Sequence, residues 1–318
     1  MRYNFCTYFD SNYLFKALAM YRSLCRQTMD FKLWVLCFDD KVYEMLSLMA
    51  LENVELIALS DFEDDDLLKV KAARSKVEYC WTCTPSLPLY ILKKHPDLEI
   101  ATYIDADLYF YSNPKVIFAE FGDSSIMLIE HRYPDKVEYM VNRFGRFCVQ
   151  FMAFRNDNNG IDALEWWRER CLEWCRYEPE DGKFGDQKYL DDWESRFKGV
   201  CVIQNKGAGL APWNIYGHHL STDGGRIKVD DDELVFYHFQ YLMIYRGRII
   251  QLGHIRLARE HKRLLYEPYI REIFDAVGYV KALDSSFSAG IMPLRFKSIK
   301  DIFWAGRGLI RGNFTMSG

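Results

Sequence analysis

The sequence has 318 residues, the length of one large domain or two small ones. Hydrophobic residues make up 49% and charged residues 27%, which is typical of a folded globular protein and excludes disordered, collagen-like and low-complexity chains. The 41 basic and 45 acidic residues give a net charge of −4. This balance argues against a nucleic-acid-binding protein, because phosphate contacts would require a surplus of Lys and Arg.

Strand-like and helix-like patterns alternate through the first hundred residues. Short apolar runs predict strands at 4–9, 31–38, 54–59 and 100–104. Apolar residues at helical spacing, with capping residues before them, predict helices at 11–25, 39–50, 60–71 and 84–92. Strands that are separated by helices of this length predict an α/β fold with a parallel sheet covered on both faces.

The pattern becomes mixed after residue 125. A long helix is predicted at 161–177, and further strands are predicted at 126–130, 147–154, 200–204, 234–239 and 248–251. Because these strands alternate less regularly with helices, we expect an antiparallel section that completes the sheet. No linker rich in Gly, Ser or Pro divides this part of the chain, which favours one continuous catalytic unit.

Cysteine usage and hydropathy suggest the compartment. There are nine cysteines, an odd number, and several of them lie within apolar runs, as is typical of proteins in reducing compartments. The sequence has no run of 18 apolar residues and no apolar leader after Arg2. We therefore expect a cytoplasmic protein.

The most informative stretch is the strand at 100–104, which runs directly into Asp105 and Asp107. If the strand continued, both carboxylates would point to one face, about 6–7 Å apart. Ligands of open parallel sheets bind at the carboxyl ends of strands. Carboxylates there favour Mg²⁺ or Mn²⁺, which complete their coordination with substrate phosphates. The pair therefore predicts a substrate with a nucleoside diphosphate or triphosphate.

Three segments carry a resemblance to a known family: FCTYFDSNYL at 5–14, YIDADLYFYSNP at 103–114 and FGDQKYL at 184–190. Over residues 3–240 the sequence resembles the nucleotide-sugar-dependent glycosyltransferases of the GT-A fold. The nearest pattern is that of the retaining family 8 enzymes and their bacterial relatives in surface-polysaccharide synthesis. The resemblance implies a Rossmann-like, mostly parallel sheet flanked by helices, with a smaller mixed or antiparallel portion. We expect a catalytic domain at 1–260 and a C-terminal helical region at 261–318.

The resemblance also implies a metal site. Asp105 and Asp107 would bind Mn²⁺ or Mg²⁺, which bridges the phosphates of a UDP-sugar, and Asp105 would also approach the ribose. His238, in the segment FYHF, would be the third ligand. The family's HxxG pattern is absent, since Tyr241 occupies the place of the glycine. The pair His218–His219 is the alternative source of a histidine ligand.

Other donor contacts are implied by position in the family pattern. Thr7 and Asp10, at the end of the first strand, would contact the uracil and ribose. Arg74 would lie near the donor sugar or phosphate, although a surface arginine is an equally good interpretation.

Catalytic and acceptor contacts follow from two later segments. Asp186 and Gln187 match the DQ pair of the retaining family: Asp186 would bind the donor sugar or orient the acceptor, and Gln187 would lie beside the anomeric carbon. The alternative for Asp186 is a helix N-cap. In NKGAGLAPWN, Trp213 would stack on an acceptor sugar and Asn214 would bond one of its hydroxyls, although Trp213 is equally well explained as a core residue.

The end of the sequence is basic. Residues 295–318 contain five basic residues and one acidic residue. Residues 295–311 mix these charges with apolar residues, which predicts an amphipathic helix either lying on an anionic membrane surface, at the inner leaflet, or docked on the domain.

We therefore predict a metal-dependent hexosyltransferase that moves a sugar from a UDP-sugar to a saccharide or lipid-linked glycan in surface-polysaccharide synthesis, with retention of configuration. One alternative is a nucleotidyltransferase that makes nucleotide sugars, although the first strand is not followed by the Gly-rich phosphate loop of such enzymes. The other is a non-catalytic protein that binds glycans or nucleotide sugars.

Overall fold

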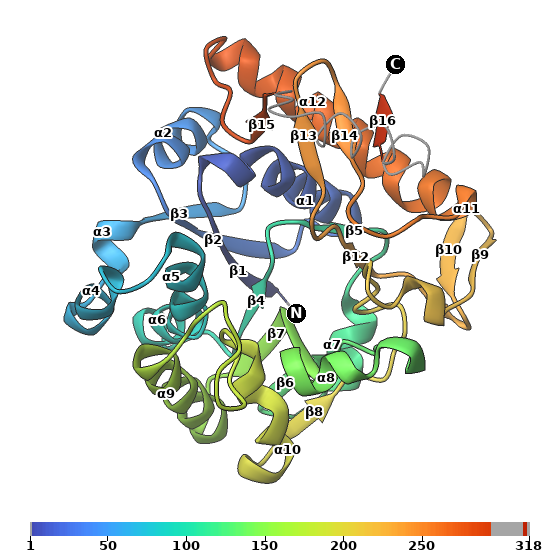
Figure 1. Cartoon of the computed structure of the whole chain (residues 1–318). Helices are drawn as coiled ribbons and strands as arrows, with labels where there is room; N and C mark the ends of the chain where they lie inside the picture. The colour runs from blue at the N-terminus through green and yellow to red at the C-terminus, as the bar shows by residue number, and fades with distance from the viewer. Residues whose placement is uncertain (1, 294–313, 317–318) are drawn as a thin grey trace.

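A seven-stranded sheet forms the centre of the molecule (Figure 1). The computed structural model describes residues 2–293 and the backbone of residues 314–316. In spatial order the strands are β3 (Val54–Ala58), β2 (Phe31–Cys37), β1 (Tyr3–Phe9), β4 (Ile100–Ile104), β7 (Phe147–Arg155), β6 (Ile126–Glu130) and β8 (Val200–Val202). Only β7 runs antiparallel to its neighbours. The mostly parallel sheet predicted from the sequence is confirmed.

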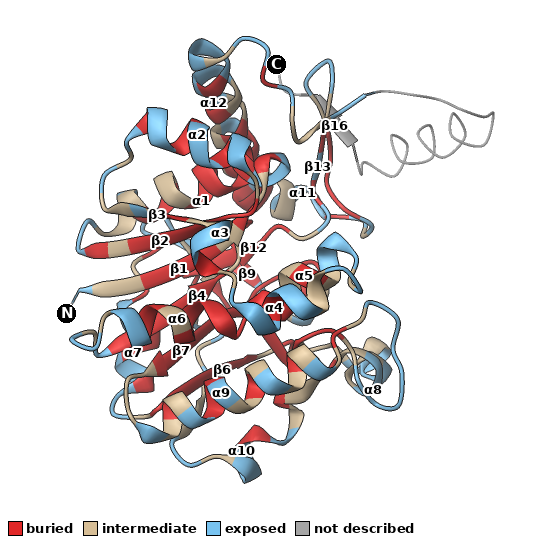
Figure 2. Cartoon of the chain, turned by 90° about the vertical axis from the view of Figure 1, so that its left-hand side faces the viewer, coloured by how far each residue is buried: buried red, intermediate tan, exposed pale blue. Residues whose placement is uncertain are grey.

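Helices cover both faces of this sheet and enclose two hydrophobic cores. The first core is covered by α1 (Leu14–Gln27), α2 (Asp40–Met49), α7 (Lys115–Phe121) and α12 (Glu267–Leu283). The second is covered by α3 (Leu59–Phe62), α4 (Asp65–Lys71), α5 (Lys76–Cys83), α6 (Ser86–Lys94), α9 (Asn158–Glu173) and α10 (Trp193–Arg196). Side chains of β1 alternate between the two, since Phe5 belongs to the first core and Cys6 to the second. Figure 2 shows buried residues along the strands and on the inner sides of the helices.

Capping side chains set the starts of several helices. Asp39 accepts a hydrogen bond from Val42 N at 2.8 Å at the start of α2. Ser75 and Glu78 form a reciprocal capping box at the start of α5. The sequence patterns did not predict α5. It is short and lies directly before α6 in the sequence, so its apolar residues could not be distinguished as a helical repeat of their own.

Smaller sheets complete the fold, as the mixed pattern after residue 125 predicted. β5 (Leu108–Phe110) pairs antiparallel with β12 (Phe236–His238). A second group consists of β9 (Leu220–Asp223), β10 (Arg226–Val229) and β11 (Asp232–Glu233). A third consists of β13 (Met243–Tyr245), β14 (Ile249–Gln251), β15 (Ile291–Met292) and β16 (Phe314–Met316). Short segments between the strands are η1 (Ser11–Tyr13), η2 (Asp135–Val137), α8 (Tyr139–Phe144), η3 (Gln187–Asp192), η4 (Ile215–Gly217), α11 (Arg259–His261) and η5 (Lys262–Tyr266).

The C-terminal region packs on the central unit through α12. Glu272 of this helix forms ion pairs with Arg22 at 3.3 Å and with Arg26 at 2.7 Å, both on α1. The ring of Tyr269 stacks on Phe239, with centroids 3.8 Å apart. The region after α12 is not wholly helical, since β15 and β16 belong to a sheet. The predicted amphipathic segment, residues 295–311, lies outside the described residues. Among the described residues, no helix has the length and apolar character that crossing a bilayer requires.

Candidate active site

Asp105 and Asp107 lie in a tight turn that joins β4 to β5. Asp105 N donates to Gln150 O of β7 at 2.9 Å, and Leu108 N donates back to Asp105 O at 3.3 Å. The strand therefore ends at Ile104, as predicted, and the two carboxylates lie in the turn rather than along an extended strand. The turn nevertheless brings the two side chains to one place, at the carboxyl end of β4.

His238 completes a cluster with these carboxylates because β12 pairs with β5, which places His238 opposite Leu108. His238 Nε2 lies 3.0 Å from Asp107 Oδ1 and 3.6 Å from Asp105 Oδ2. One ligand atom from each of the three residues lies within 4.8 Å of the others. Phe239 N donates to Asp107 O at 3.0 Å and holds the two segments together. His238 is thus brought to the carboxylates, as the family pattern implied.

The charges in this cluster compensate one another. Burial alone would raise the pKa of Asp107, but the charges of His238 and of Lys16, 3.9 Å away, lower it. Burial and the neighbouring Asp107 raise the pKa of Asp105. Burial disfavours a charged imidazole, yet the two carboxylates raise the pKa of His238 well above its ordinary value. The site therefore favours a positive charge between the two carboxylates.

Two carboxylates and one imidazole fit a divalent cation. Carboxylate oxygens suit Mg²⁺ and Mn²⁺, whereas imidazole is a ligand of transition metals, so the set as a whole suits Mn²⁺ better than Mg²⁺. Metal binding requires a neutral imidazole, and a bound cation would take the place of the proton that the carboxylates hold on His238. Within the described residues, this is the one group of three or more such side chains with converging ligand atoms.

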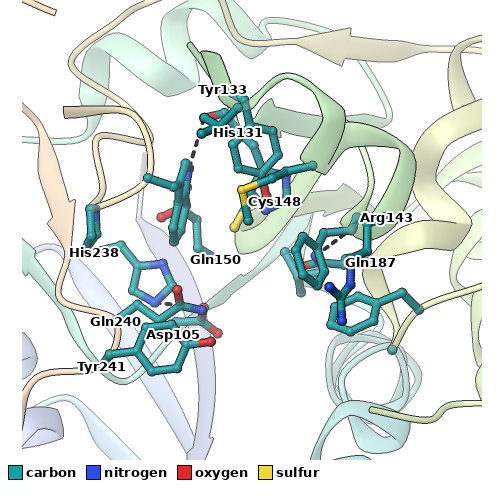
Figure 3. Close-up of a pocket in the computed structure, with 18 of the residues that line it drawn as sticks. Asp105, His131, Tyr133, Arg143, Cys148, Gln150, Gln187, His238, Gln240 and Tyr241 are labelled. Carbon is teal, nitrogen blue, oxygen red and sulfur yellow. Dashed lines mark hydrogen bonds and ion pairs between the residues drawn. The ribbon is translucent and has the colours of Figure 1, made fainter. Parts of the chain in front are cut away.

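The cluster borders a cavity of about 800 Å³, within the usual range for small-molecule sites. Figure 3 shows Asp105 and His238 on one side of it and Gln187 and Arg143 on the other, with His131, Tyr133 and Cys148 between. Much of the wall is aromatic: Tyr8, Trp81, Tyr103, Tyr133, Tyr177, Trp213, Tyr216 and Tyr241. A cavity with one acidic edge and flat apolar walls suits a ligand that carries both phosphates and rings.

Asp186 and Gln187 both line the cavity, and Figure 3 shows Gln187 across from Asp105 and His238. Gln187 Nε2 donates to Phe144 O at 2.7 Å, which fixes the amide in place. Asp186 occupies the N-cap position of η3, but its side chain makes no capping hydrogen bond there. Burial raises the pKa of Asp186 to about 7, although a hydrogen bond with Thr84 opposes the shift. Its carboxyl is therefore able to carry a proton near neutral pH.

Three predicted donor contacts are not brought to the cavity. Thr7 lies fully buried within β1, and its hydroxyl has no hydrogen-bond partner. Asp10 caps η1 and pairs with Lys76 of α5. Arg74 donates to Leu172 O at 3.1 Å, at the end of α9, where a cation also complements the helix dipole.

The two predicted acceptor contacts have different surroundings. Trp213 lines the cavity, donates from Nε1 to His131 O at 2.9 Å and packs edge-on against His238. Asn214 is buried and outside the lining; its amide donates to His131 O and Gly209 O, and it accepts from Ala211 N. The amide of Asn214 is thus engaged by the backbone.

The alternative histidine pair lies elsewhere. His218 Nδ1 and Asp230 Oδ2 are 2.9 Å apart, and neither His218 nor His219 lines the cavity.

Several polar residues of the site were not predicted. Gln150, on β7, is fully buried and lines the cavity, and neither its Nε2 nor its Oε1 has a hydrogen-bond partner. Lys16 is buried on α1 beside Asp107. Burial lowers the pKa of His131 to about 3, so this ring is neutral. The available signal was a polar residue inside an apolar run, as in VQFMAF around Gln150 and LFKALAM around Lys16.

Comparisons with known proteins place the chain in a family. No protein-family model matches the sequence. The uncharacterized protein YfnF of Bacillus subtilis (strain 168) is 34% identical over 295 residues, which cover 89% of this chain and 96% of YfnF. The uncharacterized protein YfnD of the same strain is 33% identical over 295 residues, which cover 92% of this chain and 95% of YfnD.

Two solved structures share the fold. The galactosyltransferase LgtC, in complex with donor and acceptor sugar analogues, superposes with a TM-score of 0.55 at 13% identity, over 86% of this chain and 95% of LgtC. The glycosyltransferase GlyE of Streptococcus pneumoniae TIGR4 superposes with a TM-score of 0.50 at 12% identity, over 90% of this chain and 64% of GlyE. The chain therefore belongs to the family of YfnF and YfnD, and its fold is the GT-A fold of glycosyltransferases.

Proposed function

We propose that this protein is a metal-dependent glycosyltransferase that moves a hexose from a UDP-sugar to a saccharide acceptor. The observation that carries this proposal is the convergence of Asp105, Asp107 and His238 at one edge of a cavity of about 800 Å³ in a GT-A fold.

The acidic edge of the cavity is the proposed place of the donor diphosphate. Asp105, Asp107 and His238 would hold Mn²⁺ there, which when bound would neutralise charge that develops on the departing diphosphate. Tyr103 donates from its hydroxyl to Asp105 Oδ1 at 2.8 Å and orients that carboxylate. Tyr103 and Tyr8 both line the cavity, with ring centroids 5.5 Å apart, and we propose that they contact the nucleoside.

The sugar of the donor would then extend toward Gln187 on the opposite side, with Asp186 also in the lining of the cavity. The Asp186 carboxyl is able to donate or accept a hydrogen bond near neutral pH, because its pKa is about 7. The amide of Gln187 is held by Phe144 O and presents its oxygen as an acceptor. Because Asp186 and Gln187 match the DQ pair of the retaining family and line the same cavity as Asp105 and His238, we propose that the configuration at the anomeric carbon is retained.

The choice between retention and inversion has a direct measurement. An inverting enzyme needs a base that takes the proton of the acceptor hydroxyl, and Asp186 would be the candidate. Under retention, Asp186→Asn should reduce kcat by about tenfold, the loss of one hydrogen bond, rather than by the 10²–10⁴ typical of a lost general base. Proton NMR of the first product anomer should show the donor's configuration; the opposite anomer would exclude retention.

The acceptor side is proposed from the lining. Trp213 and the other rings at the cavity suit a saccharide or a lipid-linked glycan of the kind used in surface-polysaccharide synthesis. We further propose that the protein works in the cytoplasm, at the inner leaflet when the acceptor is lipid-linked, with residues 295–311 as the contact.

Binding of UDP-sugars tests the proposal. Thermal unfolding should be followed with UDP, UDP-glucose, UDP-galactose and UDP-N-acetylglucosamine, each with Mn²⁺ and with EDTA. We expect stabilisation that requires Mn²⁺ and that is lost in Asp107→Asn but kept in Asp162→Asn, an exposed aspartate on α9. Unchanged stabilisation or transfer in Asp107→Asn would contradict a metal-dependent enzyme. Pyrophosphate released from UTP and a sugar 1-phosphate would indicate a nucleotidyltransferase instead.

A further inference from the structure

Tyr241 has a strained backbone at the edge of the cavity. Its φ is 63°, in the left-handed region that non-glycine residues adopt rarely and at an energetic cost. It is the third residue of a turn in which Leu242 N donates to Phe239 O at 3.2 Å, a place that favours Gly or Asn. The turn itself would form more readily with glycine.

The side chain of Tyr241 does not offset this cost by packing within the described residues. Tyr241 is 51% exposed as a residue, and its ring contacts His254, which is itself exposed, at a centroid distance of 5.0 Å. Arg132, another left-handed residue, differs: its guanidinium donates to the carbonyls of Ile203, Asn205 and Ala208. Arg132 has a structural reason for its conformation, whereas Tyr241 has none of that kind. Because Tyr241, unlike the exposed left-handed residue Ala50, lines the cavity, its uncompensated strain indicates a role in function.

The position of Tyr241 indicates what this role is. It lines the cavity three residues after His238, and Figure 3 shows it with Gln240 on the side of Asp105 and His238. Partial burial and the phenol of Tyr177, which also lines the cavity, raise the pKa of Tyr241. Tyr177 in turn stacks on Trp81, with centroids 5.7 Å apart and planes 10° apart. Flat rings therefore line the cavity from separate segments of the chain.

We propose that Tyr241 is a substrate-binding residue whose ring stacks on a pyranose, supplied either by the donor sugar or by the acceptor. The inference rests on the proposed glycosyl transfer. It assigns the recognition of a sugar ring, rather than of the nucleotide or the metal, to a residue whose conformation is unfavourable for folding.

Tyr241→Gly separates the two effects. The variant relieves the strain and removes the ring, so it should unfold at a higher temperature than the wild type and bind sugars less well. Ala50→Gly is the matched control: Ala50 is an exposed left-handed residue at the end of α2, with φ 45°. This control should also gain stability, but its binding should not change. Tyr241→Phe should keep both the strain and most of the binding.

The binding arms identify the source of the sugar. With Mn²⁺ present, titration calorimetry should give the same Kd for UDP in wild type and Tyr241→Gly. If Tyr241 contacts the donor sugar, Tyr241→Gly should raise the Kd of one UDP-sugar by about fivefold or more. The UDP-sugar to use is the one of the three tested that stabilises the wild type most. If Tyr241 instead contacts the acceptor, Tyr241→Gly should leave the Kd of that UDP-sugar unchanged. It should then raise the KM for methyl glycosides, tested as a panel of acceptors, by a similar factor.

Several outcomes would overturn the assignment. If Tyr241→Gly loses stability, the ring is structural. If it weakens UDP itself, or if neither sugar parameter changes, the ring does not recognise a pyranose. Wild-type protein that binds neither UDP nor any UDP-sugar would overturn the proposed function as well, and this failure is seen before any variant is made.

Discussion

The side chains that form the candidate site are mostly buried polar groups with incomplete protein partners. Asp105, Asp107 and His238 balance one another's charge, and Gln150 has no hydrogen-bond partner for either amide atom. Burying such groups costs stability unless a ligand or metal satisfies them. The sequence predicted the carboxylates because they follow an apolar strand directly. It did not predict Gln150 or Lys16, because one polar residue in an apolar run is also what an ordinary buried side chain looks like.

Asp186 should make stability depend on pH. Folding raises its pKa from the ordinary 3.8 to about 7, so between these values the native state holds a proton that the unfolded chain has released. Stability conferred by this group is therefore lost as pH rises from about 4 to 7. Asn does not titrate, so Asp186→Asn should not lose this stability as pH rises. Relative to the metal-free wild type, its unfolding free energy should therefore increase across this window by on the order of 4 kcal/mol.

Denaturant unfolding at pH 4.5, 6 and 7.5 measures this difference, since all other titrating groups are common to both proteins. Parallel stability curves for the two proteins would show that Asp186 keeps its ordinary pKa in the fold.

Gln150→Leu should separate binding from folding. The substitution removes no hydrogen bond within the described residues, so the unfolding free energy should stay the same or rise. Binding of the UDP-sugar found in the donor screen should weaken by about tenfold, the cost of one lost hydrogen bond. Gln251 is the matched control: it is buried but accepts a hydrogen bond from Tyr245, so Gln251→Leu should lose stability and keep its affinity. Equal affinity of Gln150→Leu and wild type would remove Gln150 from the site.

At the scale of elements, the regular part of the fold was predictable and the junctions were not. The strands from β1 to β4 were predicted because each is a short apolar run between periodic helices. The end of β4 at Ile104 was predicted, but the short strand β5 after the turn was not, because three apolar residues are too few to show a period. Pairing of β5 with β12 joins distant parts of the chain, and no local pattern encodes it. The resemblance to known glycosyltransferases, rather than periodicity, pointed to His238.

Gly207 should be essential to the position of β12. A Cβ added there would lie 1.9 Å from Glu233 O, and Gly207 O also accepts from Val235 N at 2.9 Å. Gly207→Ala should therefore lower the unfolding free energy by about 3 kcal/mol, at the upper end for steric overpacking, and should weaken Mn²⁺-dependent UDP binding by displacing His238. Gly278, in α12 with open space around it, is the control, and Gly278→Ala should gain about 0.5–1 kcal/mol. Both are measured by chemical unfolding; a stable Gly207→Ala would mean that the two backbones can separate at little cost.

For the molecule as a whole, the C-terminal helix α12 belongs to the first of the two cores that lie on either side of the sheet. α12 contributes Tyr269, Ile270, Ile273, Ala276 and Val280 to the first core. The sequence predicted a helical region at 261–318 beside a catalytic domain at 1–260, from patterning that describes each segment alone. Whether α12 forms a unit separate from the catalytic domain depends on its contacts with residues far away in the sequence. The hydrophobic pattern of a segment does not reveal such contacts.

A chain that ends at residue 258 tests this boundary. It would lose the partners of Phe239 and Tyr237, namely Tyr269 and Tyr266, and would expose the strand that carries His238. We expect it to show no cooperative thermal transition by circular dichroism, because much of the first core is uncovered. A chain that ends at residue 293 keeps α12 and should retain the transition. Cooperative unfolding of the shorter chain would support a catalytic domain that ends near residue 260.

The pairing of β5 with β12 also has a consequence for biosynthesis. Asp105 and Asp107 precede β5, and His238 is the last residue of β12, so the two carboxylates of the candidate metal site leave the ribosome well before its histidine. A nascent chain holds two carboxylates on a turn and lacks the third ligand until β12 has docked. We therefore expect high affinity for Mn²⁺ to be acquired late, when the chain on both sides of the cavity has folded. Incomplete chains would then neither sequester the metal nor hydrolyse activated sugars.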